Sequence, residues 1–357
     1  MKPYIRITMM VMFALVMNAP KACAAEPQPK PSVESATPSP MAGTPFSKYR
    51  LTGIHDSLEL NAYLATGTSV HSPLLVMIQG SGCDSVFAPS ADGQMQSTAG
   101  QDIVAALSGG RYNILIVDKP HVRTDAQQTG GQQDDCSIEF RRDNTLDNWS
   151  GALSASIDRL KENHLVTSNQ VRILGLSEGA LVAARLAATR SDVSHVAFIS
   201  SFGCHQIDDM LVTARRNWIA EHPEAKGDDL QTGIAEELAN VEQQFKTVFE
   251  NPDDHTSIIF GQTPKFWSTF GLACPADDLQ KTNADVFVAY GTADEQISAE
   301  GIEEIISRRL VAGKSTHTIR IIGGNHVLQI PSETQPFENL ISVFQKSLDW
   351  MQTMPNE

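Results

Sequence analysis

Short runs of apolar residues alternate along this chain with segments in which apolar positions recur at helical spacing. Residues 74–78 and, apart from Arg172, residues 171–174 are two such runs, and short apolar runs of this length are typical of strands buried on both faces. In residues 146–160, apolar side chains recur instead at intervals of three and four, which indicates an amphipathic helix. The alternation predicts an α/β fold, in which helices cover both faces of a mostly parallel sheet.

The expected strands are spread over most of the chain. Residues 57–64 alternate apolar and polar side chains, which indicates a half-buried antiparallel strand, whereas the later runs are mostly apolar. The expected strands are residues 49–54, 57–64, 74–78, 113–117, 171–174, 193–199, 285–289 and 318–322.

The pattern changes between residues 204 and 283. Residues 210–220 and 234–248 have the apolar spacing of two amphipathic helices, and the sequence around Phe266 and Trp267 is less regular. About eighty residues inserted between two strands predict a helical cap, residues 204–283. The core is then expected to comprise residues 48–203 and 284–357.

The N-terminus has the pattern of a targeting segment. Lys2 and Arg6 precede an apolar run that is too short to span a bilayer, and a small-residue cleavage site follows. Residues 1–24 are therefore predicted to be a signal peptide, and residues 25–47, rich in Pro and Ser, a disordered linker. Cys23 leaves lipid attachment as an alternative. The mature protein is expected to be exported, periplasmic or secreted, without stable membrane insertion.

Charge and cysteine content exclude several classes of partner. The formal net charge of −15 argues against binding to nucleic acid or to anionic membranes. No cysteine or histidine spacing suggests a metal site, and we expect no cofactor. Beyond the signal peptide, four cysteines permit two disulfides in three possible connectivities. They are Cys83, Cys136, Cys204 and Cys274.

The apolar run at 171–174 leads into the sequence Gly-Leu-Ser-Glu-Gly, which is followed by a helix of small residues. Strand, G-x-S-x-G and helix in this order are typical of a nucleophile elbow, in which Ser177 is exposed above the sheet on a sharp turn. Glycine is needed on both sides because a side chain there would strike neighbouring backbone. The alternative is a tight turn with an ordinary serine, so partner residues must decide between the two.

Two later loops supply those partners. His326 follows the last expected strand on a glycine-rich loop, and an imidazole there can act as base for a serine hydroxyl. His121, after an earlier strand, is the alternative base. Asp294 lies just beyond the strand at 285–289 and is the candidate acceptor that would fix the tautomer of the histidine. Functional groups gather at the carboxyl ends of strands in such a sheet, so these loops are expected to meet.

A tetrahedral intermediate would also need two backbone N–H donors. One is expected from Glu178, directly after the serine, and the other from the loop around Ser81, after the strand at 74–78. The alternative for this second loop is an ordinary glycine-rich turn.

Taken together, these motifs resemble those of the α/β-hydrolase superfamily. GLSEG matches the elbow, QGSG stands in place of the oxyanion loop H-G-x-G, GTAD carries the acid and GGNH the base. The resemblance covers about residues 48–353 and departs at Gln79, where histidine is common. It implies an eight-stranded sheet with an antiparallel second strand and a helical cap between strands 6 and 7. It also implies an acyl-enzyme mechanism.

The resemblance leaves the substrate open. We expect a serine hydrolase, of the carboxylesterase type, that cleaves small to medium ester substrates. A peptidase or amidase, an acyltransferase and a non-catalytic binding protein are the alternatives. Trp218, Phe266 and Trp267 are candidates for lining the substrate pocket, and packing of the cap on the core is the alternative role for them.

The cysteines fit the same resemblance. Cys83 and Cys136 follow neighbouring strands at the expected catalytic end, and Cys204 and Cys274 lie near the two ends of the cap. Pairing within each set would fix the oxyanion loop and the base of the cap.

Overall fold

The structure is a computed structural model that describes residues 38–54, 58–90, 93–122, 135–332, 335 and 337–353. The predicted signal peptide, residues 1–24, and most of the predicted linker lie outside the described residues. Val33–Glu357 form one compact unit, which contains all the helices and strands of the described residues.

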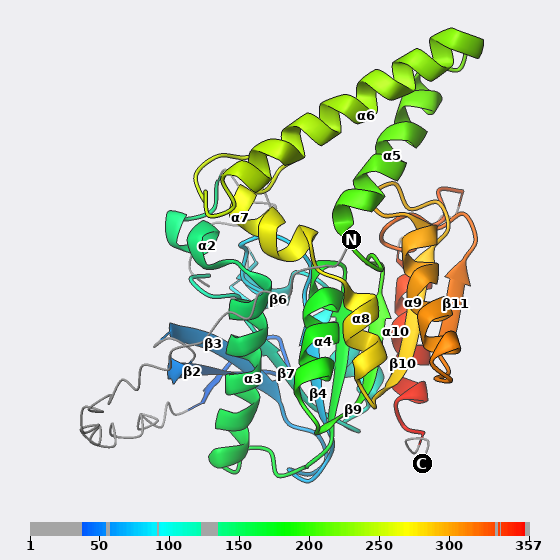
Figure 1. Ribbon diagram of the computed structural model, residues 1–357. Coiled ribbons are helices and arrows are strands. Elements are labelled where there is room, and N and C mark those ends of the chain that lie inside the picture. Colours follow the sequence, from blue (N-terminus) through cyan, green and yellow to red (C-terminus); the bar gives the residue numbers. More distant parts are fainter. Residues whose placement is uncertain are drawn as a thin grey trace, which may run out of the picture. The chain divides into compact units, whose positions relative to one another are not determined.

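A nine-stranded sheet lies at the centre of the unit (Figure 1). In spatial order its strands are β1 (Ser39–Pro40), β2 (Ser47–Ile54), β3 (Leu58–Ala65), β7 (Asn113–Val117), β4 (Leu74–Ile78), β8 (Val171–Leu176), β9 (Val193–Ile199), β10 (Asp285–Gly291) and β11 (His317–Ile321). Strands β7 to β11 in this order pair in parallel. The first three strands pair antiparallel, and β3 also runs antiparallel to β7. The predicted α/β class is therefore confirmed.

The sheet has one strand more than the eight that the resemblance implies. The additional strand, β1, lies within the predicted linker, whose last part is folded rather than disordered. Met41 and Phe46 explain the difference because both side chains are buried, and the ring of Phe46 lies 5.1 Å from that of Phe87. Burial of Met41 and Phe46 holds this segment at the edge of the sheet, although its composition alone indicates a linker.

The apolar strands bury both of their faces, as their sequences predict. In β4, Leu74, Val76 and Ile78 pack into one hydrophobic cluster, and Leu75 and Met77 pack into the other. Helices α1 (Gln101–Ser108) and α10 (Glu338–Trp350) cover the second cluster. The first cluster is covered by α3 (Leu146–Glu162), α4 (Glu178–Thr189), α8 (Pro275–Lys281) and α9 (Ala299–Val311) (Figure 1).

The long segment between β9 and β10 contains most of the remaining helices. They are α5 (Gln206–Glu221), α6 (Gly227–Glu250), α7 (Pro264–Phe266) and the π-helix η3 (Trp267–Gly271). Helices α5 and α6 pack against each other and project beyond the carboxyl edge of the sheet (Figure 1). Helix α8 also falls within residues 204–283, but it packs against α4 and α9 with the helices of the sheet.

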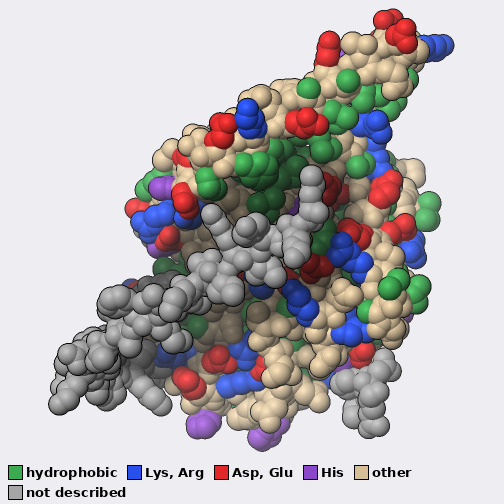
Figure 2. Space-filling view, in the orientation of Figure 1, with side chains coloured by type: hydrophobic (Ala, Val, Ile, Leu, Met, Phe, Trp, Pro, Cys, Tyr) green, Lys and Arg blue, Asp and Glu red, His purple; other side chains and the backbone are tan. Residues whose placement is uncertain are grey.

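An open groove runs between α5 and α6, where hydrophobic side chains gather in the space-filling view (Figure 2). Ile207, Leu211, Phe245 and Phe249 line it. Within the described part of the chain, no helix combines the length and the apolar character needed to cross a membrane.

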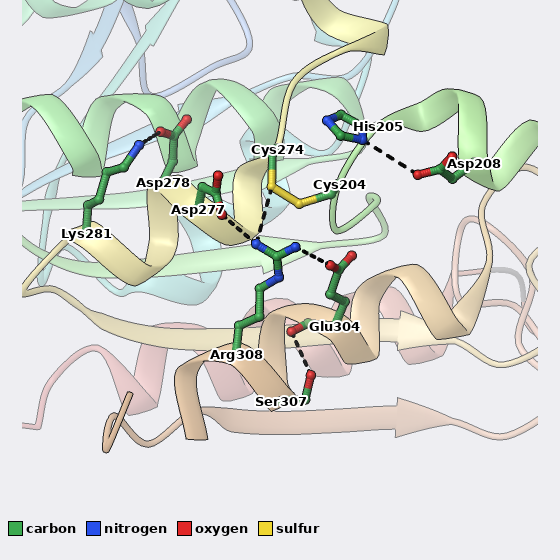
Figure 3. Close-up of a disulfide and its surroundings, with 10 residues drawn as sticks. All are labelled: Cys204, His205, Asp208, Cys274, Asp277, Asp278, Lys281, Glu304, Ser307 and Arg308. Atoms are coloured by element: carbon green, nitrogen blue, oxygen red, sulfur yellow. Dashed lines mark hydrogen bonds and ion pairs between the residues drawn. A yellow bond between two sulfur atoms is a disulfide. The ribbon is translucent and has the colours of Figure 1, made fainter. Parts of the chain in front are cut away.

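A disulfide between Cys204 and Cys274 joins the beginning of this insertion to its later part (Figure 3). The two Cα atoms lie 3.9 Å apart although 70 positions separate them in sequence. Arg308 on α9 lies beside the disulfide and forms ion pairs with Asp277 and Glu304. The chain therefore enters and leaves the insertion at one place above the sheet.

The short elements β5 (Phe87–Pro89), β6 (Met95–Ser97) and α2 (Ile138–Asp143) complete the fold. Strands β5 and β6 pair antiparallel as a separate two-stranded sheet.

Candidate active site

The segment from β8 to α4 forms the sharp turn that its sequence predicts. Ser177 has φ 55° and ψ −125°, a backbone conformation that is unfavourable for residues with a side chain. Its N–H donates to the carbonyl oxygen of Ile199 at 2.9 Å, which holds the turn against β9. A Cβ atom on Gly175 would lie 2.4 Å from the carbonyl oxygen of Gly179, and one on Gly179 would lie 2.3 Å from that of Gln79. Both glycines are therefore required by close backbone approach.

Three side chains from separate loops meet above this turn. His326 Nε2 lies 3.0 Å from Ser177 Oγ, and His326 Nδ1 lies 2.8 Å from Asp294 Oδ2. The side chain of Asp294 is 1% exposed, whereas that of His326 is 14% exposed. One imidazole thus connects a hydroxyl that faces a cavity with a carboxylate that is shielded from water.

The carboxylate of Asp294 is fixed by its own loop. Its Oδ1 accepts hydrogen bonds from the backbone N–H groups of Gln296, at 2.8 Å, and Ile297, at 3.2 Å. Its Oδ2 therefore remains directed to His326. The alternative base, His121, lies elsewhere, with its Nε2 2.7 Å from Asp143 Oδ2.

The loop after β4 lies against the serine. A Cβ atom on Gly80 would be 3.4 Å from the Cβ of Ser177, and Ser81 lines the same cavity as Ser177 and Glu178. Gln79 is buried and donates through Nε2 to the carbonyl oxygen of Val117 at 3.3 Å, so the amide supports this loop from below.

Buried Asp118, directly after β7, also holds this loop. It accepts hydrogen bonds from Tyr63 Oη at 2.7 Å, Ser85 Oγ at 3.1 Å and the N–H of Val86 at 3.0 Å. Burial raises the pKa of the Asp118 carboxyl, although these hydrogen bonds oppose the effect. Burial likewise raises the pKa of Tyr63.

A disulfide between Cys83 and Cys136 secures the outer part of the same loop. Both disulfides join the cysteines that the sequence analysis paired.

Lys119, the residue after Asp118, is a functional candidate that the sequence analysis missed. Its Nζ lies 2.7 Å from Glu178 Oε1, and the two side chains are 1% and 6% exposed. The ammonium also lies 4.3 Å from the ring centroid of Trp149. Burial lowers the pKa of Lys119, and the carboxylate of Glu178 partly opposes this effect. The ion pair anchors the first residue of α4, directly after the serine.

A cavity of about 170 Å³ opens in front of Ser177 and His326. Its walls include the apolar residues Leu181, Phe266 and Phe270. Polar residues, among them Gln206, Gln262 and Gln296, also line it. A cavity of roughly 150 Å³ is large enough for benzene, so this one accommodates a group of about six carbon atoms.

The three aromatic candidates for this cavity have different positions. Phe266 and Trp267 line it, packed against each other at 5.5 Å between ring centroids. Trp218 does not line it: its ring stacks on His222 at 4.3 Å and lies against Gly233, far along the α5–α6 hairpin. The apolar spacing of residues 210–220 predicts a helix but not how far that helix extends from the sheet, and this distance keeps Trp218 away from the cavity.

The loop of Asp294 is tied to α5 by Asp209. This buried carboxylate accepts hydrogen bonds from the N–H of Ser298, at 3.0 Å, and from its hydroxyl, while Ser298 Oγ in turn accepts from the N–H of Gly301 at 3.0 Å. Burial raises the pKa of Asp209 to about 6, and the negative charges of Asp208 and Asp294 act in the same direction, while the hydrogen bonds from Ser298 oppose it.

Among the described residues, one cluster has side-chain atoms close enough to hold a metal ion: Cys204, Cys274 and Asp277. The two sulfur atoms of this cluster are bonded to each other, which leaves no thiolate to act as a ligand.

The sheet order, the elbow and the loops at its carboxyl edge define the α/β-hydrolase fold, and comparison with solved structures agrees. Est1E from Butyrivibrio proteoclasticus is similar over 86% of this chain and 99% of its own, with 17% identity and a TM-score of 0.50. The Pyrococcus furiosus esterase Pf2001 is similar over 86% and 91%, with 15% identity and a TM-score of 0.50. The Pyrococcus horikoshii acylaminoacyl peptidase matches 88% of this chain, with 12% identity and a TM-score of 0.54, but only 43% of its own length is covered. The sequence matches no protein-family model and no curated protein.

Proposed function

We propose that this protein is a serine hydrolase that cleaves carboxylic esters of small to medium substrates through an acyl-enzyme intermediate. The observation that carries the proposal is the single imidazole of His326, within 3.0 Å of Ser177 Oγ on one side and 2.8 Å of Asp294 on the other. A serine hydroxyl needs such a base to become a nucleophile, and the base needs such an acceptor.

In the first half-reaction, Ser177 Oγ attacks the carbonyl carbon of the ester while His326 Nε2 takes the hydroxyl proton. Asp294 accepts the Nδ1–H hydrogen bond and stabilises the imidazolium that forms. Collapse of the tetrahedral intermediate breaks the bond to the alcohol, which leaves with the proton from His326. In the second half-reaction, water repeats the sequence, and the acid is released.

Negative charge on the carbonyl oxygen would be stabilised by two backbone donors. We assign these to the N–H of Glu178 and to the loop at Ser81, in keeping with their positions on the same cavity. The ion pair of Lys119 with Glu178 and the hydrogen bonds of Asp118 support the two sides of this site.

The test is labelling of the folded protein with a fluorophosphonate, followed by peptide mass mapping. We expect stoichiometric modification of Ser177 that is abolished by His326→Ala. Hydrolysis of a short-chain chromogenic ester should then exceed that of a Ser177→Ala control. Absence of both label and hydrolysis would contradict the proposal and favour a binding protein.

An amide-cleaving enzyme is the second candidate, because the acylaminoacyl peptidase is among the proteins of similar fold. Matched ester and anilide substrates with the same acyl group distinguish the two. An ester hydrolase should cleave the anilide far more slowly than the ester, whereas comparable rates would favour the peptidase.

We further propose that the protein acts outside the cytoplasm and that the helices between β9 and β10 form its cap. The two disulfides support export, because such bonds persist mainly in oxidising compartments. Contributions of Phe266 and Trp267 to the cavity support a role of the insertion in substrate selection.

A further inference from the structure

Two residues that line the proposed substrate cavity each carry a buried polar atom with no hydrogen-bond partner among the described residues. The two atoms are Ser200 Oγ and Gln262 Oε1, and both are shielded from solvent. Buried polar atoms in proteins are nearly always hydrogen-bonded, so an unpaired atom at a substrate cavity points to a partner on the ligand.

Ser200 is held rigidly beside the nucleophile. Ser200 follows β9 directly and is 0% exposed. Its backbone has φ 48°, a left-handed conformation that is unfavourable for serine. Its N–H donates to the carbonyl oxygen of Ala289 at 2.9 Å, while the preceding Ile199 accepts the N–H of Ser177. The backbone that carries this hydroxyl is thus fixed at the wall of the cavity by the same strand that fixes the elbow.

Gln262 comes from the insertion and is also held in place. Ile259 and Gln262 exchange backbone hydrogen bonds of 2.8 and 3.1 Å around a tight turn, in which Phe260 and Gly261 have φ 48° and 73°. The indole N–H of Trp267 donates to the carbonyl oxygen of Ile259 at 2.6 Å, which fastens the turn to η3. The backbone of Gln262 is therefore fixed in the insertion, from which this residue lines the cavity, whereas Ser200 lines it from the end of a sheet strand.

From these two atoms we infer that the preferred substrates are esters carrying a hydroxyl group a few atoms from the scissile carbonyl, rather than plain alkyl esters. The inference rests on the proposed function and specifies its substrate class. A hydroxyl both donates and accepts, so it can pair with Ser200 Oγ and with Gln262 Oε1. The apolar walls of Phe266 and Phe270 contact the carbon skeleton of the same group.

An alkyl group of equal size would occupy the cavity without pairing either atom. A site built for hydrogen bonds discriminates strongly against such an analogue, because its own buried polar groups are left unpaired. We therefore expect selectivity against the alkyl ester on the order of tenfold or more in kcat/KM.

Two pairs of isosteric esters test the inference and show which side of the ester enters the cavity. For the acyl side, propyl 3-hydroxybutanoate, as each enantiomer, is compared with propyl 3-methylbutanoate. For the alcohol side, 2-hydroxyethyl butanoate is compared with propyl butanoate. Release of acid is titrated at constant pH, and each rate is corrected for that of Ser177→Ala.

We expect the hydroxyl ester to be favoured in one pair, and Ser200→Ala to lower that preference, the ratio of the two kcat/KM values, roughly tenfold. Gln262→Met keeps the length of the side chain but removes the amide oxygen. It should therefore also lower the ratio of kcat/KM for the hydroxyl ester to that for its isostere. Ser156→Ala, which removes a buried hydroxyl that donates to Ala152 in α3, is the matched control and should leave the preference unchanged.

Fluorophosphonate labelling of Ser200→Ala at Ser177 establishes that the variant is folded. The inference is overturned if both alkyl esters are hydrolysed as well as their hydroxyl partners, or if both variants retain the full preference. If none of the four esters is hydrolysed above the Ser177→Ala rate and Ser177 is not labelled, the proposed function itself fails.

Discussion

Lys119 Nζ donates to Glu178 Oε1 at 2.7 Å, and both side chains are almost completely enclosed by protein. Removing one member of such a pair leaves an isolated charge in the interior, which typically costs about 3–5 kcal/mol. We therefore expect Lys119→Met or Glu178→Gln to lower the free energy of unfolding by a few kcal/mol. Urea unfolding measures the effect.

The double variant Lys119→Met/Glu178→Leu provides the control for this prediction. Because it leaves no unpaired charge, it should be more stable than the sum of the two single changes predicts. Strictly additive losses would show that the two residues do not stabilise each other.

Asp294→Asn should lower kcat/KM for an ester roughly 10³–10⁴-fold, because an amide cannot hold the imidazole in the required tautomer. The unfolding midpoint should change little. Glu295→Gln, an exposed neighbour, is the matched control and should retain activity. An equal loss in both variants would contradict the assigned role of Asp294.

Asp209 predicts a specific dependence of stability on pH. Its pKa is raised to about 6 in the folded protein, above the value near 4 of an unfolded chain, so folding favours the protonated form. The stabilisation is present below about pH 4 and is lost as the pH rises through 6. Asp209→Asn cannot ionise, so its stability relative to wild type should increase by on the order of 2 kcal/mol between pH 4 and 7.

Unfolding by urea at pH 4, 5, 6 and 7 measures this difference. Glu236→Gln, which replaces an exposed carboxylate on α6, is the control and should show no comparable increase. A difference that is constant across this pH range would contradict the prediction.

The disulfides give a further prediction. Peptide mapping under non-reducing conditions should recover Cys83 with Cys136 and Cys204 with Cys274. Replacing Cys204 and Cys274 by alanine should lower the free energy of unfolding by up to about 4 kcal/mol, from the entropy of a loop of 70 residues. A free thiol at any of the four positions, or a cross-pairing, would contradict the pairing.

The order of strands and helices could be predicted because each element is encoded by local apolar periodicity. Ser177, Asp294 and His326 could be predicted to meet because each follows a separate strand at its carboxyl end, where a parallel sheet brings loops together. The glycines of the elbow also carried a local signal, since only hydrogen fits at Gly175 and Gly179.

Other features depend on contacts between distant parts of the chain, which local patterns do not contain. Strand β1 is held by the burial of Phe46 against Phe87, 41 positions later. Lys119 would be expected at the surface, and only its pairing with Glu178, 59 positions away, explains its burial. Ser200 and Gln262 belong to no sequence motif, and they stand out only because Ser200 Oγ and Gln262 Oε1 have no hydrogen-bond partner among the described residues.

The Cys204–Cys274 bond has a consequence for how this molecule could be changed. Because the Cα atoms of Cys204 and Cys274 lie 3.9 Å apart, residues 205–273 form a cassette that a segment of different shape could replace. Ser177, Asp294 and His326 all lie outside that cassette, whereas Phe260, Gln262 and Phe266 lie within it. Recombination at this point would therefore exchange part of the substrate cavity, provided that the new segment keeps an acceptor in the place of Asp209, which holds the loop of Asp294 through Ser298.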